Sequence, residues 1–214
     1  MLDISDATAR AFSRRQHLAF PADRMEYILR VEAGWLARYT RLASGQRQIT
    51  AIYLPGDYCE PHWIIDPTST EWIVALTPVK ATAVSLESVM QDAGTYPELA
   101  RKILADLVRM LARQSSLVVA LGRKSGLERL SAVILELYDR VVAMAPDGEV
   151  DAMPLTQGDL ADIVGITPIH VNRVLKDLRG RQVLEVQRGA VTVTDPEKLR
   201  FVAINGYFPH SDAI

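Results

Sequence analysis

The chain contains a single cysteine, Cys59, among its 214 residues. One thiol cannot form an intramolecular disulfide, so a disulfide-stabilised fold is excluded and a reducing compartment is indicated. One thiol is also too few to hold an iron–sulfur cluster, which takes several cysteine ligands. With 49% apolar residues and mixed charges, we expect a globular protein of one or two domains.

The sequence also lacks long apolar segments. No run of 18 apolar residues occurs, so no membrane span is expected. The first residues, MLDISDATARAFSRRQ, contain no apolar stretch of the kind found in secretory signals. Lys and Arg (24) nearly balance Asp and Glu (26), which argues against a nonspecific nucleic-acid coat protein but allows a local basic patch. We therefore expect a cytoplasmic protein without membrane contact.

Catalytic motifs are missing as well. The sequence has no Ser-His-Asp order, no P-loop and no glycine-rich phosphate loop. Its four histidines are scattered along the chain: His17, His62, His170 and His210. No catalytic residue is predicted, and the chain is not expected to be an enzyme.

Residues 154–194 are the most informative stretch, because they predict two short helices, a tight turn and a hairpin. Thr156, with Asp159 three positions later, has the pattern of a helix N-terminus with a capping box. Gly165 is suited to end this helix, since glycine readily adopts the positive φ of a helix C-terminus. The buried face of the helix is expected to consist of Leu160, Ile163 and Val164.

The second predicted helix begins at Thr167, with Pro168 at its first position, where the missing N–H costs nothing. Its apolar face consists of Val171, Val174, Leu175 and Leu178. Gly180 is expected to end it. Two helices joined by about three residues that include a glycine are the signature of a helix-turn-helix.

The outward face of the second helix carries the predicted function. Ile169, Asn172 and Arg173 lie three and four residues apart, so they project together near the helix N-terminus. In helix-turn-helix proteins such residues reach the base edges, where Arg pairs with guanine and Asn with adenine. Thr167, Gln157 and His170 suit phosphate contacts, which position a protein without reading sequence. The predicted DNA contacts are Thr156, Gln157, Thr167, Pro168, Ile169, His170, Asn172, Arg173, Lys176 and Arg188.

A hairpin is predicted after the second helix. Its strands are residues 183–187 and 190–194, joined by a turn at Arg188-Gly189. This hairpin would be the wing of a winged helix-turn-helix. Between residues 167 and 181, four basic side chains accompany one acidic side chain, so the positive charge is local. The alternative is a regulatory module that uses the same domain for protein contacts.

Residues 20–90 have the pattern of antiparallel strands. Segments such as EYILRVEAGWLARYTRL and EWIVALTPVKATAVS are rich in Ile, Val, Tyr, Trp and Thr. Turn residues interrupt them at Gly34, Ser44-Gly45, Pro55-Gly56 and Thr77-Pro78. The spacing predicts an antiparallel barrel or a roll, and a roll would be the double-stranded β-helix of cupin-like domains. A cupin-like enzyme is an alternative, but cupins need a cluster of metal-binding histidines and these four are scattered.

A long helix is predicted from Pro97. Its apolar positions alternate at intervals of four and three, as in a coiled-coil dimer seam: Ile103, Leu107, Met110, Gln114, Leu117 and Leu121. A second set repeats every seven residues beside it: Leu104, Leu111 and Val118. The helix either pairs with a second copy or packs on its own barrel. Gln114 places a polar group in the seam, with Ser115 next to it, and a polar seam residue either fixes the register or meets a ligand from across the interface.

A further helix is predicted after the long one. Ser125 and Glu128 form a complete capping box, which begins a helix that runs to about Val142. Residues 122–126 are therefore the predicted hinge. Asp147-Gly148 is a predicted turn that leads into the helix-turn-helix.

A β-roll, a long helix and a winged helix-turn-helix in one chain resemble the Crp/Fnr family of bacterial transcription regulators. The most specific parts are LTQGDLADIVGITPIHVNRVLKDLRGRQVLEV and the LPGDYCE turn, which is similar to the opening of the family's phosphate cassette, with Gly56 and Asp57 in place. The resemblance implies an α+β fold with a sensor β-roll (1–96), a dimerisation helix and hinge (97–124) and a DNA-binding domain (125–214). It also implies a homodimer on a palindromic operator in double-stranded DNA, and RNA polymerase as a partner.

The sequence differs from the cyclic-AMP-binding members of the family at the residues that hold the cyclic phosphate. Those members carry an Arg that neutralises the cyclic phosphate, whereas this chain has Ser69-Thr70 followed by Glu71. A carboxylate repels a phosphate, so cyclic-nucleotide gating is not expected. Pro168-Ile169 also replaces the family's commonest Arg-Glu pair, so the operator is expected to differ from that of the cyclic-AMP member. The candidate effector pocket consists of Gly56, Asp57, Glu71, Gln114 and Ser115.

Cys59 and His62 form a Cys-x-x-His pair, and His62 lies where carbon-monoxide-sensing members of the family carry an axial haem histidine. A thiolate and an imidazole are suitable ligands, so a haem- or metal-gated regulator is an alternative. The other interpretation is an inert Cys packed in a turn beside a surface His. Two ligands are too few to predict a metal site, so no cofactor is assigned.

Overall fold

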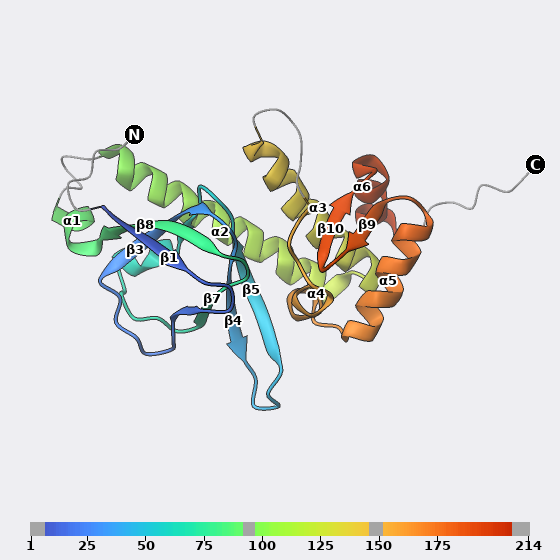
Figure 1. Cartoon of the computed structure of the whole chain (residues 1–214), viewed down its shortest axis with the longest axis horizontal. Helices are drawn as coiled ribbons and strands as arrows, with labels where there is room; N and C mark the ends of the chain where they lie inside the picture. Colours follow the sequence, from blue (N-terminus) through green and yellow to red (C-terminus); the bar gives the residue numbers. More distant parts are fainter. Residues whose placement is uncertain (1–6, 92–96, 146–151, 207–214) are drawn as a thin grey trace, which may run out of the picture. The chain divides into compact units, whose positions relative to one another are not determined.

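The computed structural model describes residues 7–91, 97–145 and 152–206 (Figure 1). The chain divides into two compact units, Met1–Gln114 and Ser115–Ile214. The predicted turn at Asp147-Gly148 and the histidine His210 lie outside the described residues. Within the described ranges, no helix is long and apolar enough to span a membrane.

Where the structure describes the first unit, the chain forms two four-stranded antiparallel sheets. One has the order β1 (Thr8–Phe12), β8 (Val79–Ser85), β3 (Tyr27–Ala33) and β6 (Tyr58–Cys59). The other has the order β2 (His17–Ala19), β7 (Trp72–Ala75), β4 (Leu36–Arg41) and β5 (Arg47–Tyr53). The predicted antiparallel β domain is confirmed, although its first strands, β1 and β2, precede the strand pattern noted at residues 20–90.

The core of this unit combines side chains from both sheets. Ala19, Leu36, Tyr53, Ile73 and Ala75 come from one sheet, while the other contributes Leu29, Val31, Cys59, Val79, Ala81 and Ala83. A tight turn at Gly34 joins β3 to β4 and has φ of +85°. A Cβ at Gly34 would lie 2.1 Å from the Pro78 carbonyl oxygen, so only glycine fits this crossing.

Two short helical segments and one long helix complete this unit: a 3₁₀ turn (Pro61–Ile64), α1 (Leu86–Gln91) and the start of α2 (Pro97–Arg123). On α2, Leu99 and Ile103 are buried in a second apolar cluster. Its other members are Ile28, Tyr58, Val84 and Val89. The Asp106 carboxylate accepts a hydrogen bond from the Tyr58 backbone N–H at 2.9 Å, which fixes this face of α2 on the β sheet.

The predicted dimer seam is corrected at two positions. Ile103 is 2% exposed in the apolar cluster, and Met110 is buried with its sulfur 4.0 Å from the Arg38 guanidinium. Both side chains therefore belong to the protein's own core and are unavailable to a partner helix. The other predicted seam positions are half-buried: Leu107, Gln114, Leu117 and Leu121.

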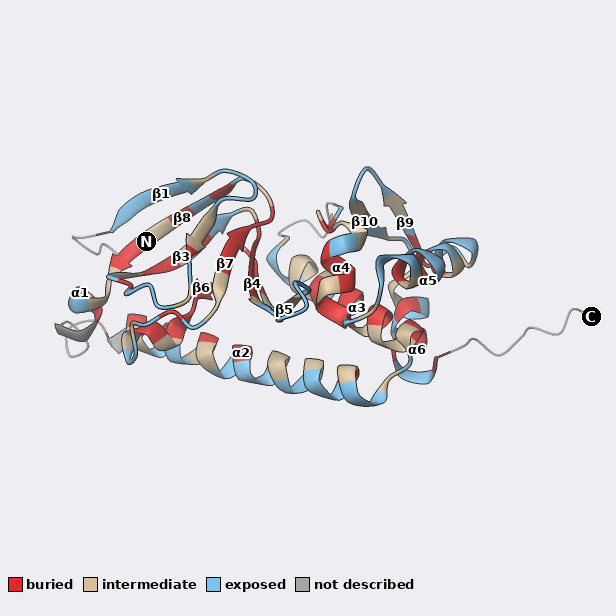
Figure 2. Ribbon diagram, turned by 90° about the horizontal axis from the view of Figure 1, so that it is seen from below, coloured by how far each residue is buried: buried red, intermediate tan, exposed pale blue. Residues whose placement is uncertain are grey.

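A different stripe of α2 is exposed, one residue further along the chain (Figure 2). Its four apolar members are between 57% and 68% exposed: Leu104, Val108, Leu111 and Val118. Their intervals of four, three and seven residues place them on one face of the helix. Ser115 is exposed on the same stripe. This exposed set, here called the α2 stripe, includes the second heptad series found in the sequence.

The described residues of the second unit form the end of α2, four further helices and a hairpin. They are α3 (Gly126–Met144), α4 (Gln157–Val164), α5 (Pro168–Gly180), β9 (Leu184–Gln187), β10 (Ala190–Val193) and α6 (Pro196–Asn205). The break between α2 and α3 falls at Lys124 and Ser125, and the capping box of Ser125 with Glu128 forms as predicted. Helix α6 was not predicted, although its cap Asp195 and its first residue Pro196 are ordinary helix-start signals.

Candidate nucleic-acid interface and sensor site

Helix α4 and the turn after it form as the sequence predicts. The Thr156 hydroxyl accepts a hydrogen bond from the Asp159 N–H, and the Asp159 carboxylate accepts one from the Thr156 N–H, each at 3.1 Å. Gly165 ends the helix with φ of 66°. Because the Thr156 hydroxyl also donates to the Asp159 carboxylate at 2.6 Å, its proton is committed inside the capping box. Thr156 was predicted as a DNA contact, and that assignment stays a prediction.

Helix α5 presents the predicted reading residues on its outward face. Thr167 caps the helix by accepting a hydrogen bond from the His170 N–H at 3.2 Å, and Pro168 occupies the first turn. Ile169 is 84% exposed, and the side chains at 172 and 173 are exposed on the same face. The four apolar residues of the opposite face are buried: Val171, Val174, Leu175 and Leu178.

Two polar contacts orient the reading residues before any DNA is present. The Asn172 side-chain amide donates to the Gln157 carbonyl oxygen at 3.0 Å, which links α5 to the first residue of α4. An Arg173 guanidinium nitrogen lies 3.3 Å from the His170 Nε2. A free amide or guanidinium would have to lose rotamer freedom on binding, so these contacts reduce the entropic cost of recognition.

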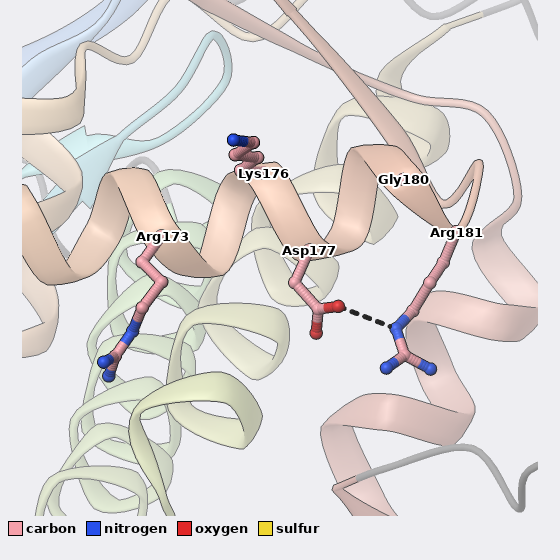
Figure 3. A pocket seen from close by; sticks show the side chains of 5 residues that line it. All are labelled: Arg173, Lys176, Asp177, Gly180 and Arg181. Atoms are coloured by element: carbon pink, nitrogen blue, oxygen red, sulfur yellow. Dashed lines mark hydrogen bonds and ion pairs between the residues drawn. The ribbon is translucent and has the colours of Figure 1, made fainter.

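The C-terminal half of α5 lines an open hollow with basic side chains (Figure 3). Its lining residues are Arg173, Lys176, Asp177, Gly180 and Arg181. Asp177 accepts a hydrogen bond from the Arg181 guanidinium at 3.0 Å, so the acidic residue of this face is neutralised. The predicted helix end is confirmed: Gly180 is the last residue of α5, and Gln182, with φ of 58°, makes the left-handed turn that follows.

The predicted wing is present. Strands β9 and β10 pair antiparallel, with Gln187 opposite Ala190. At the tip, Arg188 has φ of 48° and Gly189 has φ of 79°, the two positive values of a tight type I′ turn. The Arg188 side chain is exposed at this tip. The wing thus offers one guanidinium for a backbone phosphate.

Arg129 ties α3 and α4 to the end of α2. From α3, its guanidinium donates to the carbonyl oxygens of Ala120 (3.2 Å), Lys124 (3.1 Å) and Val164 (2.9 Å). These carbonyls lie in the last turn of α2, in the break after it, and at the C-terminus of α4. The last carbonyls of a helix lack the i+4 donor of its interior, so one cation adds donors at the ends of two helices. The Ala120 carbonyl also accepts from the Lys124 N–H at 3.2 Å, so Arg129 is a second donor there. We call Arg129 with its three carbonyls the Arg129 clamp.

The candidate sensor site in the first unit contains a buried cation that the sequence did not indicate. Arg38 of β4 is buried, and its guanidinium contacts the Glu60 carboxylate at 3.1 Å and the Glu71 carboxylate at 2.8 Å. The Thr50 hydroxyl donates to Glu71 at 3.1 Å. Glu71 is therefore neutralised internally. We call Arg38, Glu60 and Glu71 the buried ion cluster.

Glu60 is the most constrained member of the buried ion cluster. It has φ of 52°, a left-handed value that is unusual for a residue other than glycine. Burial alone would raise its pKa, but the contacts with His62 and Arg38 and the Tyr53 hydroxyl outweigh burial and lower it. The Tyr53 hydroxyl donates to the carboxylate, and burial, followed by the charge of Glu60, raises the pKa of Tyr53. Tyr53 therefore stays a neutral donor to an ionised Glu60.

The remaining residues of the predicted effector pocket lie in two places. Gly56 and Asp57 form the turn before β6, where Asp57 accepts a hydrogen bond from the Leu54 N–H at 2.8 Å. Asp57 also lies 3.4 Å from the Arg113 guanidinium of α2. Gln114 and Ser115 follow Arg113 on that helix, half-buried and exposed respectively. The pocket assignment stays a prediction.

Cys59 and His62 do not fit a haem or metal site. The Cys59 side chain lies in the core with no exposed surface, and burial, followed by the Glu60 charge, raises the pKa of its thiol. A metal ligand must be a thiolate, which this environment disfavours. The His62 Nδ1 lies 3.1 Å from the Glu60 carboxylate and so supports the buried ion cluster. Within the described residues, no three His, Cys, Asp or Glu side chains gather as a metal site would require.

The chain is similar to known regulatory proteins over most of its length. Residues 128–202 match the model of the Crp-like helix-turn-helix domain. The anaerobic regulatory protein of Haemophilus influenzae is 25% identical over 87% of this chain and 72% of its own length. The nitrogen fixation regulation protein FixK of Bradyrhizobium diazoefficiens is 26% identical over 79% of this chain and 71% of its own.

Solved structures share the fold. FixK2 from Bradyrhizobium japonicum superposes with a TM-score of 0.79 at 26% identity, over 91% of this chain and 96% of that one. A transcriptional regulator of the CRP family from Thermus thermophilus, TTHB099, superposes with a TM-score of 0.74 at 19% identity, over the same shares of the two chains. Both comparisons support the predicted succession of β domain, long helix and helix-turn-helix.

Replacing Arg129 with alanine should destabilise the second unit. Three carbonyls lose a charged donor, which should lower the free energy of unfolding by roughly 1–3 kcal/mol. Urea denaturation followed by far-ultraviolet circular dichroism measures this change. The matched control is Arg200→Ala, which removes an exposed Arg that pairs with Asp139 on the surface. Equal midpoints for the two variants would show that the Arg129 clamp contributes nothing.

Replacing Arg38 with methionine should destabilise the first unit. It leaves the Glu60 carboxylate buried without its cation, and breaking a buried pair in this way costs about 3–5 kcal/mol. Tryptophan fluorescence during urea denaturation measures the change in the free energy of unfolding of this unit. The three tryptophans of the sequence, Trp35, Trp63 and Trp72, all lie in it. The control Arg30→Ala removes a surface partner of Glu32 and should change stability by about 1 kcal/mol or less.

Proposed function

Because the chain belongs to the Crp/Fnr family of transcription regulators, we propose that it binds a palindromic DNA operator as a homodimer. Like its relatives, it is a regulator and not an enzyme. In this proposal, residues 1–96 are the sensor domain, 97–124 the dimerisation helix and hinge, and 125–214 the DNA-binding domain. The protein acts in the cytoplasm and, as family likeness implies, together with RNA polymerase.

The observation that carries DNA binding is the outward face of α5. Ile169, Asn172 and Arg173 are exposed near the N-terminus of the second helix of a helix-turn-helix. This is the part of the motif that enters the major groove. Lys176 extends the face, and Arg188 at the wing tip lies where a wing meets the adjacent backbone. Gln157, Thr167 and His170 flank this face and contact phosphates in this proposal.

The observation that supports a homodimer is the α2 stripe. Four large apolar side chains in one line on a helix are unfavourable in water, and a second copy of the same helix would cover them. The predicted seam is therefore proposed in the corrected register, with Leu104, Val108, Leu111 and Val118 at its centre. The half-buried seam positions that were predicted, such as Leu107 and Leu117, flank it.

Gating by cyclic AMP is not part of this proposal. Arg38 is the buried cation of the sensor unit, and Glu60 and Glu71 already pair with it. A cyclic phosphate would have to displace a carboxylate from that cation and would meet a second negative charge beside it. Haem or metal gating through Cys59 and His62 is not proposed either, because the thiol is buried and protonated and the imidazole contacts Glu60.

Arg173→Ala tests DNA recognition. Loss of a bidentate contact with guanine should weaken binding to the preferred duplex by about 1–3 kcal/mol, or roughly 5- to 150-fold. The measurement is fluorescence anisotropy with duplexes selected by the protein from a random pool. Arg200→Ala, which removes an exposed Arg of α6, should leave the affinity unchanged. Affinity that is unchanged by Arg173→Ala on every duplex would contradict base reading by this residue.

Leu111→Asp tests the dimer. A charge at the centre of the α2 stripe should give monomers, and the loss of two-site binding should lower operator affinity by about 100-fold or more. Sedimentation velocity measures the oligomeric state. The control Ile204→Asp changes an exposed apolar residue of α6, 66% exposed, and should leave the dimer intact. An unchanged dimer in Leu111→Asp would rule out the α2 stripe as the interface.

A further inference from the structure

Ile169 is a large apolar side chain that is exposed on the proposed DNA-binding surface. Between residues 152 and 194, all of which the structure describes, it is the one large apolar side chain that is strongly exposed. Isolated exposed apolar residues are common on proteins and need no explanation by themselves. Ile169 differs from such residues in its position. It lies in the first turn of α5, on the same face as Asn172 and Arg173.

The fold does not require an isoleucine here. The buried face of α5 is complete without it, with Val171, Val174 and Leu175 in the core. At 84% exposure, the side chain adds almost nothing to the burial of apolar surface. A β-branched residue is also slightly unfavourable in a helix. The first turn itself is held by the Thr167 cap and Pro168, independently of the side chain at 169.

Isoleucine has neither a hydrogen-bond donor nor an acceptor, which narrows what it can recognise. On the major-groove edge of the base pairs, the C5 methyl of thymine is the apolar group that distinguishes one base from the others. Asn172, three residues on, is oriented by its hydrogen bond to Gln157 and keeps its oxygen and one amide hydrogen for adenine. The neighbouring face therefore combines an adenine reader with an apolar side chain.

We propose that Ile169 determines specificity by packing on the C5 methyl of a thymine in each half-site. The inference rests on the proposed DNA-binding function and extends it from a surface to one chemical group. A contact of this kind discriminates thymine from cytosine without a hydrogen bond. It also discriminates thymine from uracil, which pairs identically and lacks only the methyl.

The test uses duplexes that the protein selects from a random pool, with each thymine of the half-site replaced in turn by deoxyuridine. At one position, binding should weaken about fourfold, which corresponds to about 0.8 kcal/mol for one buried methyl. The same replacement should have no effect on Ile169→Ala, because the partner of the methyl is gone. Since Ile169 is exposed, this variant retains the fold.

Arg188→Ala is the matched control. It removes a guanidinium from the exposed wing tip and should weaken binding to the thymine and uracil duplexes equally, so the fourfold ratio is retained. If no thymine replacement changes the affinity of the unaltered protein, or if Ile169→Ala keeps the fourfold ratio, the inference is wrong while DNA binding stands. If the protein selects no sequence from the pool, the proposed function and the inference both fail.

Discussion

The second unit depends on one constraint, which is that the backbone groups at helix ends need partners outside their own helix. Helices α4 and α5 have 8 and 13 residues, lengths that are marginal for an isolated helix in water. Ser125, Thr156, Thr167 and Asp195 each cap a helix N-terminus with their side chains. The Arg129 clamp supplies donors at the opposite ends of α2 and α4. At α5, the Thr167 cap and the hydrogen bond from Asn172 to Gln157, the first residue of α4, therefore add to the packing of its apolar face.

Interactions between residues near each other in the sequence could be predicted, and those between distant residues could not. Thr156 with Asp159 and Ser125 with Glu128 are three residues apart, so the pattern itself contains both partners. The carbonyl of Val164 lies 35 residues from Arg129, and nothing in the sequence near Arg129 marks the contact. The helix-turn-helix was predictable because it is built from short-range signals.

In the sensor unit, too, contacts between residues far apart in the sequence could not be predicted. The ion pairs of Arg38 and the packing of α2 are two examples. Glu71 is predictable as a carboxylate that repels phosphate, but its partner Arg38 lies on the distant strand β4, and Glu60 lies 22 residues from Arg38. On α2, apolar residues occupy two neighbouring faces, so their spacing predicts a helix without showing which face the core uses. The burial of Ile103 and the exposure of Leu104 decide this point, and only the packing of β3, β8 and α2 reveals it.

At the wing tip, the residue that suits DNA binding is not the residue that suits the turn. A type I′ turn needs positive φ at both central residues, and Asn, Asp or Gly meet this requirement at the lowest strain. This chain has Arg188 there, with φ of 48°, and glycine only at the second position. The turn therefore carries a conformational penalty at the residue that holds the positive charge. At this one residue, the protein trades local stability for a cation at the end of a projecting hairpin.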